Sequence, residues 1–433
     1  MSSTVGWKRF GAAWIAAATT LLAACGGGGG SDGNTGLGGA MGGGTASSPV
    51  SGIQKEKGTQ EELPLLPLKQ RVDGPLQDAR FVGPMRMTTD SLGNTYVVDQ
   101  LVITEYGSTV NIIRKIDSRG NVTTLKAAEK DGGMLQFERI ADIAVDSQGT
   151  LYVPSEHAIK KIDARGNVSV FAGKPGEPGE QDGAAGEGRL AWPSSIAVDA
   201  DGAVYVSSSM ARTIRKISPE GKITTIAGSS KDGRTWRQRP GGDDGDGLDA
   251  RFVDPTSLAV DGKKNVYVFD FGRVRKIAPN GAVSTLAGPP AFSTWKRYAD
   301  GLGEQAIFGF AESAMAADAD GTVYVADREN NVVRKISPAG MVTTIGKRYN
   351  LQAQNEDGTL TPPKLTSYYE DGASSSAVFE NLVGITIRAG MVYVSEISSA
   401  TIRQISADGV VSTWAGVRSR SPEYPEYPGT IPP

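Results

Sequence analysis

Several residue types on which enzymes and nucleic-acid-binding proteins depend are scarce in this chain. Its 433 residues include one cysteine, Cys25, and one histidine, His157. A single cysteine cannot form an intramolecular disulfide. No serine lies in a nucleophile-elbow motif, and a Ser-His-Asp triad would have to use His157, which we interpret as an ordinary loop residue. The formal net charge of −3 gives no electrostatic support to nucleic-acid binding. We therefore predict no catalytic residues and no nucleic-acid partner.

An apolar run near the start, GAAWIAAATTLLAA, is too short to span a membrane comfortably and follows two basic residues. It leads into Leu22-Ala23-Ala24-Cys25, which resembles the bacterial lipobox. The resemblance implies cleavage before Cys25 and lipidation of that residue, with acyl chains that anchor the protein in a membrane. An ordinary signal peptide with a chance cysteine is the alternative. Gly26 in place of an aspartate implies, by resemblance to Gram-negative sorting rules, the outer membrane, with the protein facing either the periplasm or the outside.

Low-complexity segments flank the remaining sequence. Residues 1–24 are the predicted signal peptide, and residues 25–62 combine the lipidated cysteine with a Gly-rich flexible tether. Residues 417–433 form a Pro-rich tail, in which proline removes backbone donors and stops strands. Residues 63–416 are left for the folded domain.

That central region repeats itself. Six segments align, each with alternating apolar residues and an Asp/Gly/Asn turn: MRMTTDSLGNTYVVD, IADIAVDSQGTLYVPS, SSIAVDADGAVYVSS, TSLAVDGKKNVYVFD, AMAADADGTVYVAD and VGITIRAGMVYVSE. A triplet such as Arg-Lys-Ile follows each segment, then a glycine turn and a β-branched run. Four short strands separated by turns form an antiparallel meander, whose strands we letter a to d. Six such sheets, none able to bury both faces alone, predict an all-β, six-bladed β-propeller.

One copy carries a family resemblance. Residues 321–346, GTVYVADRENNVVRKISPAGMVTTIG, resemble the NHL repeat, although the Asn-His-Leu triplet itself is absent from this chain. The resemblance extends over residues 70–416 and implies an NHL-like propeller. It implies little about activity, because one scaffold carries many functions. NHL-type lyases that use zinc draw several histidines from different blades, so their mechanism is not expected here.

The stretch GGDDGDGLDARFVDP, residues 241–255, is typical at first sight of a calcium loop. However, an Asp-Gly pair precedes an aromatic residue or leucine in every repeat, and Asp244-Gly245 is the fourth copy. We predict that this segment turns the chain from the outer strand of one blade to the inner strand of the next, with the apolar residue between blades. Only Asp243 and Asp246 have no counterpart in the other repeats, and they remain weak candidates for calcium ligands. No other cofactor is predicted.

Strand direction places the d–a and b–c loops on one face, and all the variation in loop length falls there. We call it the long-loop face and expect it to bind a glycan or an envelope protein. Its candidate ligand-binding residues are Trp236, Arg237, Arg239, Trp295, Arg297, Tyr298, Tyr349 and Tyr368. The alternative is that these aromatic side chains fasten the loops to the rim.

Acidic residues after strand b support a second hypothesis. The candidate channel-mouth acids are Asp99, Asp270, Asp327 and Glu396. Six-bladed lactonases of the SMP-30/gluconolactonase type hold a divalent metal with such residues, so a metal-dependent hydrolase is the alternative function. Aspartate at this step can also cap its own turn. We favour a non-enzymatic, monomeric binding or scaffold lipoprotein.

Overall fold

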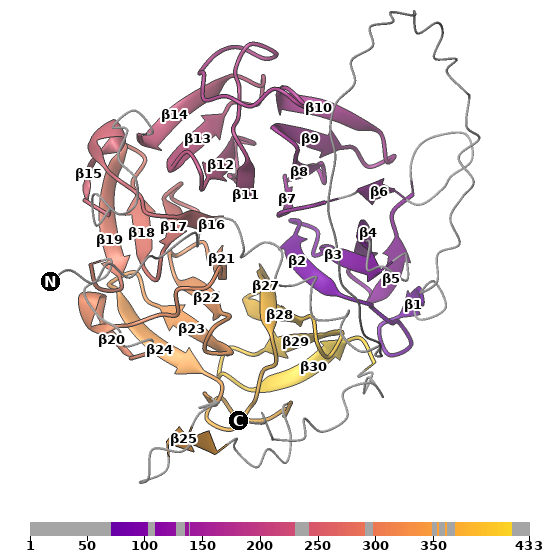
Figure 1. Cartoon of the computed structure of the whole chain (residues 1–433). Coiled ribbons are helices and arrows are strands. Elements are labelled where there is room, and N and C mark those ends of the chain that lie inside the picture. Colours follow the sequence, from indigo (N-terminus) through magenta and orange to yellow (C-terminus); the bar gives the residue numbers. More distant parts are fainter. Residues whose placement is uncertain are drawn as a thin grey trace, which may run out of the picture. The chain divides into compact units, whose positions relative to one another are not determined.

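Six antiparallel sheets surround a central axis in the part of the chain that the structure describes (Figure 1). The computed structural model describes residues 71–102, 109–126, 135–137, 139–229, 242–290, 298–348, 353–354, 360–361 and 369–417. The blades belong to one compact unit, residues 67–101 with 109–433. The fold is a six-bladed β-propeller, as the repeat predicted.

Each blade contributes strands a to d in chain order, from the axis outward. Blade 1 is β2 (Pro84–Thr89), β3 (Thr95–Val102), β4 (Thr109–Ile116) and β5 (Asn121–Thr124), with β6 (Gln136–Phe137) also paired to β4. Blade 2 is β7 (Ala144–Val145), β8 (Leu151–Ser155), β9 (Ala158–Ile162) and β10 (Val168–Gly173). Blade 3 is β11 (Pro193–Val198), β12 (Val204–Ser208), β13 (Thr213–Ile217) and β14 (Ile223–Gly228).

The second half of the ring follows the same order. Blade 4 is β16 (Pro255–Val260), β17 (Val266–Asp270), β18 (Val274–Ile277) and β19 (Ala282–Ala287). Blade 5 is β21 (Ala314–Ala317), β22 (Val323–Asp327), β23 (Val332–Ile336) and β24 (Met341–Ile345). Blade 6 is β27 (Leu382–Arg388), β28 (Met391–Glu396), β29 (Thr401–Ile405) and β30 (Val411–Ala415). Outside the blades, β25 (Ala353–Gln354) pairs with β26 (Leu360–Thr361).

Helical structure among the described residues is limited to the 3-10 turns η2 (Gly247–Asp249) and η3 (Gly303–Gln305). Within the same ranges, no helix has the length and apolar character needed to cross a membrane.

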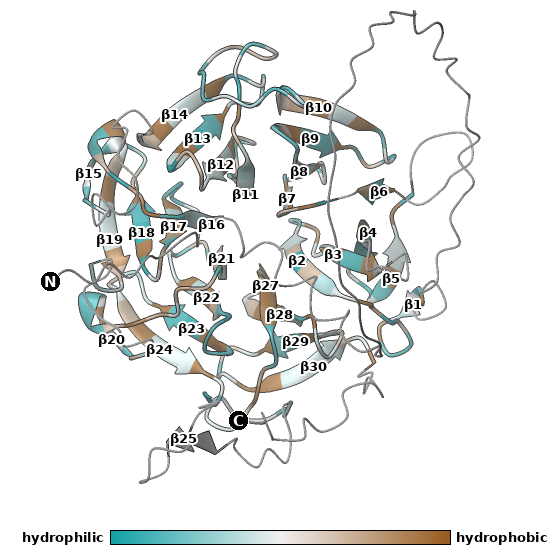
Figure 2. Ribbon diagram, viewed as in Figure 1, coloured by the Kyte–Doolittle hydropathy of each residue, from teal (hydrophilic) through white to brown (hydrophobic). Residues whose placement is uncertain are grey.

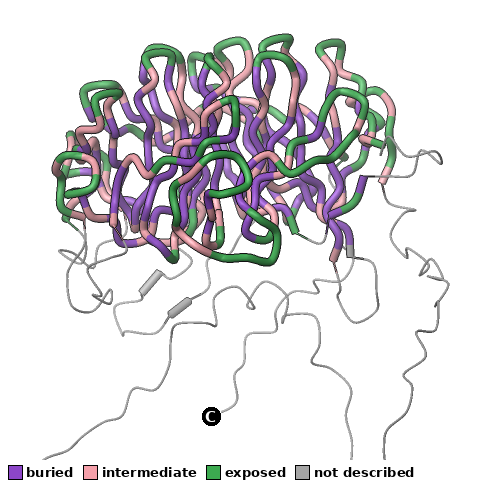
Figure 3. Tube along the Cα trace, turned by 90° about the horizontal axis from the view of Figure 1, so that it is seen from above, coloured by how far each residue is buried: buried purple, intermediate pink, exposed green. Residues whose placement is uncertain are grey.

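The core lies between neighbouring blades. Apolar and polar residues interchange along individual strands (Figure 2), and buried segments fill the interior between exposed turns (Figure 3). The apolar residue of each Asp-Gly segment packs there, as predicted. Phe252 shares a cluster with Ile214 of blade 3 and Val268 of blade 4, and Phe308 occupies the equivalent place between blades 4 and 5. Phe81, Phe137, Leu190 and Phe379 do the same elsewhere.

The Asp-Gly pairs also form short strand segments or single bridges at the outer edge of the blades. Each described pair adds a short segment outside strand d of the blade that follows it in sequence. These segments are β1 (Gly74–Pro75) on β5, β15 (Gly245–Asp246) on β19, β20 (Gly301–Leu302) on β24, and single bridges Gly183 to Ile223 and Gly372 to Val411. The sequence pattern did not predict this fifth layer, because two residues are too few for a recognisable strand period.

Among the described residues, the ring closes between blade 6 and blade 1 without a shared strand. Every strand of blade 1 comes from the N-terminal part and every strand of blade 6 from the C-terminal part. At this seam, Ser395 donates its hydroxyl hydrogen to the carbonyl of Met85, and the hydroxyl groups of Thr386 and Thr89 lie 3.1 Å apart. An apolar cluster that contains Phe81 and Tyr393 covers the outer part of the seam.

Candidate functional site

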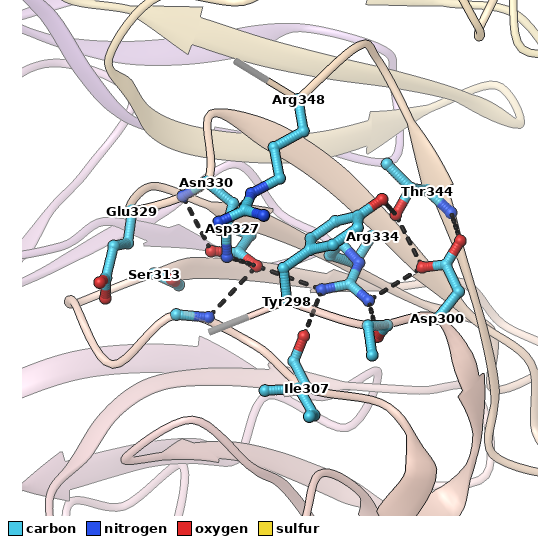
Figure 4. Close-up of polar contacts among 12 residues, drawn as sticks. Tyr298, Asp300, Ile307, Ser313, Asp327, Glu329, Asn330, Arg334, Thr344 and Arg348 are labelled. Carbon is cyan, nitrogen blue, oxygen red and sulfur yellow. Dashed lines mark hydrogen bonds and ion pairs between the residues drawn. The ribbon is translucent and has the colours of Figure 1, made fainter. Parts of the chain in front are cut away.

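A buried arginine on strand c organises five of the six blades. These residues are Arg114, Arg215, Arg275, Arg334 and Arg403, and none is more than 1% exposed. In blade 5, Arg334 donates to Asp327 at 3.3 Å and to Asp300 at 2.9 Å (Figure 4). Its guanidinium group lies 4.8 Å from the ring centre of Phe308. We call this arginine, its acids and its aromatic ring the arginine clamp.

The four candidate channel-mouth acids belong to these clamps. Asp99, Asp270, Asp327 and Glu396 are 0% exposed. Their carboxylates accept from the arginine of their own blade at distances of 3.1, 3.3, 3.3 and 3.2 Å. They also accept backbone N–H groups from the d–a segment, for example those of Val82 and Gly83 by Asp99. Burial raises the pKa of Asp99, Asp327 and Glu396, and the arginines oppose that rise. The structure therefore places these four carboxylates inside the protein, engaged with cations.

The Asp-Gly aspartates form the outer half of each clamp. Asp244 accepts from Arg275 at 2.7 Å and from the backbone N–H of Thr285 at 2.9 Å. The equivalent aspartates are Asp73, Asp182, Asp300 and Asp371. The sequence analysis did not predict that the Asp-Gly aspartate pairs with the strand c arginine, although the Asp-Gly pair and the Arg-Lys-Ile triplet recur in the same blades. Their joint recurrence is the signal that could have revealed it.

Blade 2 lacks the clamp. Lys160 stands where the other blades have arginine, Ser155 stands in place of the buried acid, and Val170 replaces the threonine of strand d. Blade 3 also has a serine, Ser208, in place of the buried acid, but it keeps the buried Arg215, which donates to Asp182 at 2.6 Å. Blade 2 is therefore the blade in which both the cation and the buried acid are replaced.

The calcium candidates lie beside the clamp of blade 4. The Asp243 backbone carbonyl accepts from Arg251 and from Arg275. Asp246 is exposed in β15. Within the described ranges, no group of three or more His, Cys, Asp or Glu residues is placed to hold a metal ion.

Most of the predicted ligand-binding residues fall outside the described ranges. These are Trp236, Arg237, Arg239, Trp295, Arg297, Tyr349 and Tyr368, together with the lipidation candidate Cys25. Tyr298 is described, and it packs in the clamp of blade 5. Its ring lies 4.8 Å from the guanidinium group of Arg334 and 4.8 Å from that of Arg348, and its hydroxyl donates to Thr344 at 3.0 Å.

The strands nearest the axis enclose a channel. Its wall is built from β2, β7, β11, β16, β21 and β27, and it encloses about 800 Å³ with open solvent included. Small side chains such as Ala197, Ala259 and Ala316 line much of it. Strand a begins on the long-loop face, so the first residues of these strands surround one end of the channel. We call this end the axial mouth.

Charged side chains from several blades gather at the axial mouth. Arg86 of β2 forms an ion pair with Glu312, which precedes β21, so the pair joins blades 1 and 5, which are not neighbours in the ring. The Arg86 side chain is 11% exposed and the Glu312 side chain 52%. Asp142 also lines the channel, and its carboxylate accepts from the Ser195 hydroxyl at 2.6 Å and from the N–H groups of Ile196 and Ile143.

Asp254, which directly precedes β16, has a raised pKa. Burial raises the pKa of Asp254 to about 6, and the carboxylates of Asp270 and Glu312 contribute, whereas Arg212 opposes the rise. Acids whose pKa is shifted in this way are common where ligands bind, although they also occur in structural networks.

Apolar side chains lie on the same face as the axial mouth, in the segments before strand a and after strand b. Phe271 and Phe310 stack with ring centres 5.0 Å apart at an angle of 17°. Trp192 is 53% exposed and lies edge-on to His157, with ring centres 4.5 Å apart. Met210 is 73% exposed. The sequence analysis missed these four residues and Arg86, because none of them recurs from blade to blade. The available signal was their place in the repeat: Arg86 lies within strand a, Trp192 and Phe310 precede strand a, and Met210 and Phe271 follow strand b.

Comparisons with known proteins support the fold. No family model matches the chain. Human Teneurin-1 is 31% identical over 233 residues, which are 52% of this chain and 8% of that protein. Teneurin-3 of Danio rerio is 26% identical over 361 residues, which are 77% of this chain and 12% of that protein. The chain thus spans only a small part of these curated relatives.

Two solved structures named as auxiliary nutrient binding proteins are similar to this propeller. The one from Bacteroides thetaiotaomicron has a TM-score of 0.51 and 13% identity, over 79% of this chain and 72% of its own. The one from Bacteroides ovatus has a TM-score of 0.50 and 14% identity, over the same shares of 79% and 72%. At this level of identity the likeness shows a shared fold.

Proposed function

We propose that the protein is a ligand-binding module of the bacterial cell envelope, tethered through lipid on Cys25, and that its ligand binds at the axial mouth. One observation carries the binding role: exposed apolar residues and ionic groups from several blades meet at one end of a channel. Concave sites with aromatic walls and a few polar groups are typical of small-molecule binding. The binding role of the two nutrient-binding propellers fits the proposal, although they share only the fold.

The position of the buried acids supports this role over a metal-dependent hydrolase. A hydrolytic metal needs several carboxylates that converge on one open point. Asp99, Asp270, Asp327 and Glu396 instead face the arginine of their own blade and are closed off from solvent.

The binding role is tested with residues 26–433 and a panel of neutral oligosaccharides, acidic oligosaccharides, peptidoglycan fragments and peptides. We expect at least one member of the panel to bind in calorimetric titration. The affinity of the Phe310→Ala variant for that ligand should be about tenfold lower, since aromatic anchors dominate such sites. Val410→Ala is the matched control, because Val410 is an exposed apolar residue in a c–d turn on the opposite face. The proposal fails if no member of the panel binds, or if hits are unaffected by Phe310→Ala and by Trp192→Ala.

The anchor is tested by Cys25→Ser in the full chain, expressed in a Gram-negative host. We expect the wild-type protein in the membrane fraction and the variant in the soluble periplasmic fraction, because only the cysteine can carry the acyl chains. Metabolic labelling with a fatty-acid analogue gives an independent readout. An unchanged membrane fraction together with unlabelled wild-type protein would contradict the anchor.

A further inference from the structure

We propose that the axial mouth recognises the carboxylate of an acidic sugar with Arg86 and Arg328, and that the Glu312 carboxylate occupies this position in the free protein. The inference rests on the proposed binding role and names the class of ligand. The site is formed by residues of blades 1 and 5, which meet only at the axis.

Arg86 lies at the centre of the proposed site. Arg86 lines the channel, and its side chain is 11% exposed. Within the described ranges, its guanidinium group donates a hydrogen bond to Glu312. A guanidinium group has five N–H donors in a planar fork that matches a carboxylate. Most of these donors therefore remain available on the channel side, in a partly desolvated place where hydrogen bonds to an anion are strong.

Arg328 supplies a second cation to the same place. It is half-buried in the b–c loop of blade 5, and its Nε–H donates to Asn381 at 3.3 Å. Burial lowers the pKa of Arg328. The positive charge of Arg86 lowers this pKa further, whereas the Glu312 carboxylate raises it. Arg328 therefore lies within electrostatic reach of both members of the Arg86–Glu312 pair. Two cations close enough to repel each other favour an anion beside them.

Glu312 is suited to give way to a ligand. Its side chain is 52% exposed, and its carboxylate forms an ion pair with Arg86. Because about half of the Glu312 side chain already contacts solvent, its carboxylate can return to water at little cost when a ligand carboxylate takes its place. In contrast, Asp142 is held through hydrogen bonds to Ser195, Ile196 and Ile143 and is fixed in the wall. The ligand carboxylate would take over the ionic contact with Arg86, and the displaced Glu312 carboxylate would face solvent.

The surroundings favour a sugar over a peptide. Phe310 lies two residues before Glu312 and stacks on Phe271, so a half-exposed aromatic surface adjoins the carboxylate position. Apolar C–H faces of a sugar ring can pack on such a surface, and its hydroxyl groups can donate to Asp254.

An extended peptide would need free backbone groups on the inner strands. Three of these N–H groups are already engaged with side chains: that of Ile196 with Asp142, that of Leu258 with Ser195 and that of Met315 with Ser257.

The test is calorimetric titration of residues 26–433 with trigalacturonic acid, its methyl ester and an N-acetylated dipeptide with a free C-terminal carboxylate. We expect trigalacturonic acid to bind, and the methyl ester, which lacks the charge, to bind at least about tenfold more weakly. Arg86→Gln and Arg328→Gln should each weaken binding about tenfold or more, and Glu312→Gln should strengthen it several-fold because the internal competitor is gone. Arg119→Gln, on an exposed turn of the opposite face, removes one positive charge elsewhere and should leave affinity unchanged.

Each alternative outcome is informative. Equal affinity for the methyl ester, or unchanged or weaker binding by Glu312→Gln, would overturn the carboxylate exchange. Binding of the dipeptide without trigalacturonic acid would overturn the sugar assignment. If trigalacturonic acid does not bind but another member of the panel does, and that binding requires Phe310, the proposed ligand class is wrong and the binding role is retained. If no ligand binds, both proposals are wrong. Should Arg86→Gln fail to fold by circular dichroism, Arg328→Gln and Glu312→Gln still decide the question.

Discussion

Replacement of Arg334 by methionine is expected to lower the free energy of unfolding by about 3–5 kcal/mol, because it leaves a buried carboxylate without its cation. Arg334 is 0% exposed and bridges Asp327, Asp300 and the backbone carbonyl of Ile307. Methionine fills a similar volume, so the loss reports the charge and its hydrogen bonds rather than a cavity. Urea denaturation followed by far-ultraviolet circular dichroism measures it.

Two further variants isolate the cause. Asp327→Asn in the Arg334→Met background removes the unpaired charge and should restore part of the lost stability, as blade 2 implies with Ser155 and Lys160 at these positions. Lys335→Met changes the neighbouring, partly exposed cation and should alter stability by less than about 1 kcal/mol. A loss below about 1 kcal/mol for Arg334→Met would show that the clamp is not a stabilising element.

Gly384→Ala should destabilise the ring by about 3 kcal/mol or more, because it forces an atom into the seam between blades 6 and 1. A Cβ at this position would lie 2.1 Å from the Met85 carbonyl oxygen and 2.7 Å from the Ser395 hydroxyl oxygen. The first of these is backbone of the neighbouring blade and cannot rotate away. Since no strand is shared across the seam, the strain acts directly on ring closure.

Hydrogen exchange locates the effect. We expect faster exchange in β2 and β27 of Gly384→Ala and little change in β16 and β17 on the far side of the ring. Gly245→Ala is the matched control, because its added Cβ would have its nearest neighbour at 3.6 Å, an ordinary contact. Equal stability of the two alanine variants would mean that the blades at the seam separate enough to accept the methyl group.

The repeat made the architecture predictable, whereas the site depended on positions that do not repeat. Six copies of one strand pattern define six blades, and Phe252 and Phe308 were correctly expected between blades. The role of the strand c arginines was not recognised. Arg334 and Asp300 are 34 residues apart in sequence, and their contact exists only because the Asp-Gly segment passes outside strand d.

Asp99, Asp270, Asp327 and Glu396 show the limit of topology alone. Topology places all four near the end of strand b on the long-loop face. In the structure Asp270, Asp327 and Glu396 are the last residues of strand b, and Asp99 lies three residues before the end of β3. Whether a carboxylate there faces the channel or the interior depends on its partner. The buried arginine of the same blade decides it, because a desolvated cation needs an anion beside it.

The sequence by itself determined the number of blades, the strand order and the face that carries the long loops, since alternating apolar residues and glycine turns act locally and recur six times. Only the tertiary structure decided that the ring closes without a shared strand and that Arg86 meets Glu312. Those two residues are 226 positions apart, and neither belongs to the repeat. Closure of the ring brings the first residues of all inner strands to one point, so the chemistry of the axial mouth is a property of the closed ring.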